Sequence, residues 1–281
     1  KLGLVGSEMC IRDRGYSLDS EIGFLMAGQT HTFSMQIEEA NGIGTLDNIT
    51  VMLCGDGPSN IGKMSYDPSR GTLWSSPDSM VTPLSVQTQS VTSTVTQLSM
   101  EFTLSWEYPW EESQSSCKPS VSILDDLNTV AYQNNIGELS WQLDNKFMAM
   151  PDSIVDLTEP VMEAIDGQLF LRQGDEFSIS GSIVYAGSGV PITDIPEGLM
   201  VEASVIYGSA IISSDADVTS NSRFTITVPL PDRVPLSPYM GVSVEVMNVP
   251  GLGSSSSNED FSVVVDSCLL YTSPSPRDPT S

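Results

Sequence analysis

The stretch Leu98-Ser-Met-Glu-Phe-Thr-Leu-Ser-Trp106 (98–106) places an apolar side chain at every second position, with Ser, Glu, Thr and Ser between them. Successive side chains of a strand point to opposite faces of its sheet, so this alternation predicts a strand with one buried face and one solvated face. Such strands are typical of antiparallel sheets. Strands of parallel sheets are buried on both faces and have continuous apolar runs instead.

The same alternation recurs along the chain, separated by turn-forming residues such as Asn41-Gly42 and Gly187-Ser188-Gly189. Helical periodicity is nearly absent. Many short strands with turn signals between them predict an all-β fold of two tandem antiparallel β-sandwich, Ig-like domains. Segment 82–97 is rich in Ser, Thr, Gln and Val and alternates weakly, which predicts either an edge strand with a long loop or an insertion. Further strands are predicted at 33–37, 49–53, 139–143, 177–185, 201–207, 224–228, 242–246 and 261–265.

Both ends of the chain have the sequence of translated sequencing adapter. The DNA element AGATGTGTATAAGAGACAG, translated from its third base, gives Met9–Asp13, and its reverse complement, translated from its second base, gives Cys268–Ser273. We therefore expect residues 1–14 and 267–281 to be adapter-derived scars and leave them out of the fold prediction. The rest is expected to be an internal piece of a longer reading frame.

The predicted domains meet near Met150-Pro151. Residues 15–150 are expected to form β-sandwich domain 1 and residues 166–266 an Ig-like β-sandwich domain 2. Between them, 151–165 is predicted to be a linker, because its part from Pro151 to Pro160 is acidic and begins and ends with proline.

The chain is strongly acidic, with a formal net charge of −25. Such a charge maintains solubility and repels polyanions, so nucleic acid is excluded as a partner and no membrane contact is expected. The composition fits either an acidic, well-solvated surface or dedicated binding of cations. The sequence indicates no cofactor, and calcium is the one ion for which it offers candidate ligands.

Two of the four cysteines lie in the predicted scars, which leaves Cys54 and Cys117. They are either a disulfide or two buried thiols. The chain has one histidine, His31, at the start of a predicted strand, where we expect a partly exposed polar residue. With a single histidine and no CxxC motif, most zinc sites and catalytic triads are excluded.

The second half also resembles a known class of repeats. Gly174-Asp-Glu-Phe-Ser-Ile-Ser-Gly181, Gly189-Val-Pro191 and Ser222-Arg-Phe224 are similar to segments of Ig-like and transthyretin-like β-sandwich repeats of microbial surface proteins. Ser222 stands where those repeats have a glycine. The first half is similar in style to tandem repeats in very large surface proteins of marine archaea. The resemblance implies a stalk, coat or adhesin without catalytic residues.

Two groups of residues are candidate ligand sites. Trp106, Tyr108 and Trp110 share one face of an extended strand and would form either a sugar-binding platform or core and strand-end packing, since Trp106 continues the apolar face of 98–104. Asp215, Asp217 and Asn221 offer oxygen ligands for calcium, or else belong to a solvated hairpin.

Asn48-Ile-Thr50 is an N-glycosylation sequon that opens a predicted strand. The carboxylate doublets Glu38-Glu39 and Asp125-Asp126 do not form catalytic pairs, because adjacent strand residues point to opposite faces. No catalytic residue is therefore predicted.

These features predict a non-catalytic structural or adhesive module of a secreted or cell-surface protein. Its expected partners are neighbouring β-sandwich domains of the same chain, with a glycan or a cell-surface protein as alternatives. Two rival functions remain open: an accessory spacer or carbohydrate-binding module of a secreted hydrolase, and a calcium-stabilised adhesion repeat.

Overall fold

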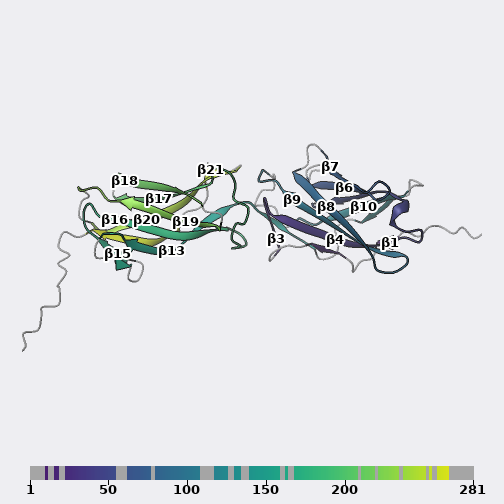
Figure 1. The fold of residues 1–281 in the computed structure, drawn as a ribbon, viewed down its shortest axis with the longest axis horizontal. Helices are drawn as coiled ribbons and strands as arrows, with labels where there is room; N and C mark the ends of the chain where they lie inside the picture. Colours follow the sequence, from purple (N-terminus) through teal and green to yellow (C-terminus); the bar gives the residue numbers. More distant parts are fainter. Residues whose placement is uncertain are drawn as a thin grey trace, which may run out of the picture. The chain divides into compact units, whose positions relative to one another are not determined.

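A computed structural model describes residues 10–11, 16–18, 23–54, 62–76, 80–107, 117–125, 130–133, 139–158, 162–163, 168–207, 210–218, 221–233, 237–250, 253–254 and 258–265. These residues form β-strands and one 3₁₀ turn, η1 (Ile43–Thr45), and no α-helix occurs among them. The chain divides into two compact units: residues 1–145 with 185–190, and residues 146–184 with 191–281. Figure 1 shows the strands of both units. The predicted all-β class is confirmed.

Unit 1 is built from two five-stranded antiparallel sheets. One has the order β1-β4-β9-β8, with β2 also paired to β4; the other has the order β11-β10-β5-β6-β7. A short parallel pair, β12 with β3, accompanies them. The strands are β1 (Cys10–Ile11), β2 (Ser17–Leu18), β3 (Phe24–Met26), β4 (Thr30–Glu38), β5 (Leu46–Met52), β6 (Lys63–Asp67), β7 (Thr72–Ser75), β8 (Val81–Ser90), β9 (Val95–Leu104), β10 (Ser120–Asp125), β11 (Val130–Gln133) and β12 (Gln142–Asp144).

The core of unit 1 lies between these two sheets. In β9 the alternating residues of the opening stretch are buried, from Leu98 to Leu104, and they pack with the buried faces of β4, β5 and β10 in one cluster. Burial of each such side chain contributes roughly 1.5–3 kcal/mol, which explains why alternation fixes the orientation of each strand.

Unit 2 is built from two sheets with the orders β14-β13-β16-β19 and β15-β22-β20-β17-β18, the second with β21 paired to β20. In unit 2, β13 pairs with β14, β16 with β19, and β17 with β18 and β20 in antiparallel orientation, as do β20 and β22, whereas β15 and β22 are parallel. The strands are β13 (Phe147–Asp156), β14 (Met162–Glu163), β15 (Gln168–Leu171), β16 (Glu176–Tyr185), β17 (Met200–Tyr207), β18 (Ala210–Asp217), β19 (Arg223–Pro229), β20 (Ser237–Val249), β21 (Gly253–Ser254) and β22 (Asn258–Val265).

The predicted linker differs from the structure. Residues 151–156 lie inside β13, and the boundary between the units falls after Asn145. Pro151, one of the prolines that suggested a linker, lies within β13 beside Gly181 of β16. A side chain at Gly181 would place its Cβ 2.4 Å from the carbonyl oxygen of Met150. Glycine at this position permits the close approach of the two backbones.

Two smaller expectations are also resolved. Segment 82–97 forms the edge strand β8, a short turn closed by Val91 N–H donating to the Val95 carbonyl at 2.8 Å, and the start of β9. His31 is buried rather than partly exposed, with 3% of its surface accessible. Its Nε2 donates to the Met26 carbonyl at 2.9 Å, and this hydrogen bond satisfies the buried ring.

Candidate functional sites

A disulfide is packed in the core of unit 1. Cys54, just after β5, and Cys117, before β10, are joined by a disulfide with a Cα–Cα distance of 4.8 Å. Both residues are buried. The bridge closes 63 residues of chain, and strands of the same sheet flank both of its ends.

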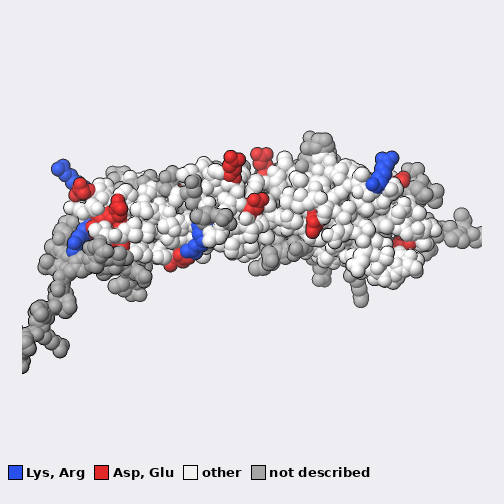
Figure 2. Space-filling model, viewed as in Figure 1, with Lys and Arg blue, Asp and Glu red and all other residues white. Residues whose placement is uncertain are grey.

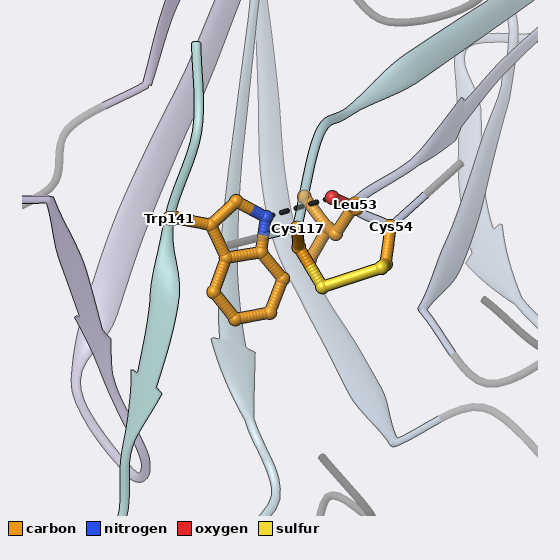
Figure 3. Close-up of a disulfide and its surroundings, with 4 residues drawn as sticks. All are labelled: Leu53, Cys54, Cys117 and Trp141. Carbon is orange, nitrogen blue, oxygen red and sulfur yellow. Dashed lines mark hydrogen bonds between the residues drawn. A yellow bond between two sulfur atoms is a disulfide. The ribbon is translucent and has the colours of Figure 1, made fainter. Parts of the chain in front are cut away.

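Trp141 lies beside this disulfide and is fully buried (Figure 3). Its indole Nε1 donates to the Leu53 carbonyl at 2.7 Å, and its backbone exchanges hydrogen bonds of 2.7 and 3.0 Å with Cys117. Trp141 therefore binds the chain on both sides of the bridge. A buried indole needs such an acceptor for its N–H, and this geometry supplies one.

The predicted aromatic platform is only partly within the described residues. Tyr108 and Trp110 lie outside them. Trp106 lies after β9, where its ring stacks on Tyr185 with a centroid distance of 6.2 Å and an interplanar angle of 5°. The ring also lies against Gly28, whose φ is +77° and where a Cβ would lie 2.3 Å from the indole. Trp106 thus packs within unit 1, which includes Tyr185.

Asp144, at the end of β12, holds the 185–190 loop of unit 1. Its Oδ2 accepts from Ser188 N–H at 2.6 Å and from Gly187 N–H at 3.0 Å. The hydroxyl of Tyr185 donates to the Ala27 carbonyl at 2.6 Å. These contacts join residues more than 40 positions apart, and no local sequence signal indicated them. They satisfy a buried carboxylate, which is otherwise costly in a core.

The candidate calcium ligands lie on a strand and in the turn that follows it. Asp215 and Asp217 belong to strand β18 rather than to a hairpin turn, and their side chains lie outside the described part of the chain. Asn221 is exposed in the turn before β19. Among the described residues there is no group of three or more His, Cys, Asp or Glu side chains arranged to hold a metal ion.

The register of β17 instead reveals acidic residues in adjacent strands. Glu202 is opposite Glu245 of β20 on one side and opposite Asp215 of β18 on the other. Like charges directly opposite each other destabilise a sheet by roughly 0.2–1 kcal/mol.

We expect Glu202→Gln to raise the thermal melting temperature at 10 mM NaCl, and the gain to disappear at 1 M NaCl, where charges are screened. A gain independent of salt would contradict this explanation. Glu107→Gln, at an exposed position of unit 1, is the matched control.

Unit 2 also contains a buried aspartate, Asp156. Asp156, at the end of β13, is 2% exposed and accepts from Thr158 N–H at 2.8 Å. Burial raises the pKa of Asp156, and the nearby charge of Asp175 raises it further. The folded state therefore binds a proton more readily than the unfolded state, so the charged form of Asp156 destabilises the fold at neutral pH.

Because the pKa of Asp156 is raised in the folded state, Asp156→Asn should change the stability in a pH-dependent way. The amide oxygen retains the acceptor for Thr158, and the charge is removed. We expect a higher melting temperature than wild type at pH 7. The difference should vanish as the pH falls below 3.8, the ordinary pKa of an aspartate, where Asp156 is neutral in both states. Thermal melts at pH 3 to 8 measure it, and a lower melting temperature of the variant at pH 7 would refute the assignment.

The sequon lies within the strand rather than at an exposed turn. Asn48 is in β5, paired with Leu124 of β10, and its Oδ1 is buried. The Thr50 hydroxyl is 3.0 Å from the Ser65 hydroxyl of β6, and both residues are buried. In the folded unit the sequon threonine is therefore hydrogen-bonded inside the sheet.

No protein-family model matches the chain, and no curated protein matches it. No helix of the described residues has the length and hydropathy needed to cross a membrane.

Proposed function

We propose that this chain is a non-catalytic structural or adhesive module of a secreted or cell-surface protein, with Ig-like domains in tandem. The observation that supports the proposal is the Cys54–Cys117 disulfide beside Trp141 in the core of unit 1. Disulfides persist in oxidising compartments and are rare in the cytosol, so a disulfide built into the core favours a protein that folds outside the cytosol.

The mechanism that follows is rigidity. The cross-link reduces the conformational entropy of the unfolded chain. Trp141 joins the segments around the disulfide through the hydrogen bond of its indole to Leu53 and its backbone hydrogen bonds with Cys117. Aspartates such as Asp144 hold backbone N–H groups of a loop. Such contacts stabilise a spacer or an adhesive surface.

The surface charge is consistent with this role. Figure 2 shows acidic side chains, with few basic ones, on the described part of the face in view. A net charge of −25 favours a dispersed and well-hydrated chain, which suits a module exposed to an external medium.

The test is to determine the coding sequence on both sides of residues 15–266 in the source DNA. The proposal predicts further β-sandwich domains together with a secretion signal and a surface anchor. An adjoining domain with a catalytic constellation would contradict a stalk or adhesin and would make these units accessory parts of a hydrolase. Neighbouring segments typical of a cytosolic enzyme would refute the extracellular assignment altogether.

A further inference from the structure

Strand β8 forms one edge of a sheet of unit 1. It pairs with β9 from Val81 to Ser90, and among the described residues no strand pairs with its other side along 86–90. An unpaired strand edge presents a row of backbone N–H and C=O groups to which another strand can bind.

The two halves of β8 differ in how this edge is protected. The first half contains Pro83 and an irregular register between Pro83 and Ser85, and both features discourage pairing with another strand. In the second half, Gln87, Thr88, Gln89 and Ser90 are all exposed. Since neighbouring side chains point to opposite faces, neither face is covered there.

The second half also lacks the charges that natural edge strands use to prevent association. Residues 79–100 contain no Asp, Glu, Lys, Arg or His, although the chain has a net charge of −25. In Figure 2 most of the surface over β8 and β9 is white, that is, uncharged. Two copies of this chain carry the same negative net charge and repel each other, and a neutral edge keeps that repulsion small where two backbones approach.

The sequence of this half is also self-complementary. In Ser85-Val-Gln-Thr-Gln-Ser90, an antiparallel pairing centred on Thr88 places Gln87 opposite Gln89 and Thr88 opposite Thr88 of the second copy. Thr–Thr pairs are among the favourable cross-strand pairs, and the two-fold symmetry matches the commonest type of homodimer.

We propose that residues 86–90 of β8 are a homotypic pairing edge, at which two copies of this chain join their sheets through antiparallel β8–β8 pairing. The occupant is a second copy, because the edge is neutral and its sequence complements itself. This inference does not depend on the proposed function.

The test is sedimentation equilibrium of the full chain at 10–500 μM in 0.5 M NaCl, with Cys10→Ser and Cys268→Ser in every sample to exclude other cross-links. We expect a monomer–dimer equilibrium for this background. Thr88→Lys and Thr88→Glu should each raise the dimer dissociation constant about tenfold or more, since each places like charges opposite each other. Thr72→Lys and Thr72→Glu, at an exposed site of β7, are the matched controls and should not.

The pair of opposite charges separates local pairing from general repulsion. Lysine reduces the net negative charge and glutamate increases it, so a general effect would move the two variants in opposite directions. That result, or a background protein that stays monomeric throughout the range, overturns the proposal. Melting temperatures by circular dichroism verify that each variant is folded.

Thr88→Cys should also cross-link two copies on mild oxidation while Thr72→Cys does not, and equal cross-linking of both would place the contact elsewhere.

Discussion

Replacing Trp141 with alanine is expected to lower the free energy of unfolding of unit 1 by about 3–5 kcal/mol, the range for truncating a buried tryptophan. Trp141 is fully buried beside the Cys54–Cys117 disulfide, so the variant leaves a cavity in the core and removes the donor to the Leu53 carbonyl. Urea unfolding followed by circular dichroism measures the loss. A change below about 1 kcal/mol would mean that Trp141 is not part of a packed core.

Trp141→Phe is the matched control because it retains an aromatic ring and removes the indole N–H. It should cost less than alanine, on the order of 1–3 kcal/mol, with the Leu53 carbonyl left without this donor. If both variants cost the same, the hydrogen bond rather than the packing would dominate the contribution of Trp141.

Removing the disulfide is expected to have an effect of similar size. Cys54→Ala together with Cys117→Ala should lower the free energy of unfolding by roughly 4 kcal/mol, from the loop-closure entropy of a cross-link spanning 63 residues. The comparison protein carries Cys10→Ser and Cys268→Ser and keeps the bridge. Reducing that protein with dithiothreitol should reproduce the loss. Equal stability of the oxidised, reduced and double-alanine forms would contradict a stabilising disulfide.

Local patterning predicted most of the strands, because alternation depends only on which side chains face the core. Residues 98–104 and 224–228 are alternately buried and accessible as predicted. The order of strands in each sheet and the parallel pair of β15 with β22 do not follow from alternation. They depend on long-range packing, for which a single sequence gives no local signal.

The errors arose where a residue type has more than one structural use. Proline is usually found at the ends or edges of strands. Pro151 nevertheless lies within β13, where the neighbouring Gly181 has no side chain to clash with the backbone of β13. A lone histidine at a strand start is usually accessible, whereas His31 is buried by its bond to the Met26 carbonyl. In each case the deciding partner is distant in the sequence or invisible in the local pattern.

The partners of the core disulfide were also beyond prediction. Two cysteines suggested a bridge, but Trp141 follows both of them, whereas immunoglobulin domains have a tryptophan between the paired cysteines. The likeness to Ig-like repeats rests on the second half and offered no guide here. The sequence placed Trp141 in the predicted strand 139–143, where it alternates with Leu139 and Leu143, but nothing in that pattern indicated the disulfide as its neighbour.

The most direct test of the account is peptide mapping without reduction, on protein secreted into an oxidising compartment with Cys10→Ser and Cys268→Ser. After denaturation and alkylation, we predict that the peptides containing Cys54 and Cys117 are recovered as one disulfide-linked species. Recovery of both cysteines in alkylated form, in protein that is folded by circular dichroism, would contradict a module built on a disulfide-stapled core.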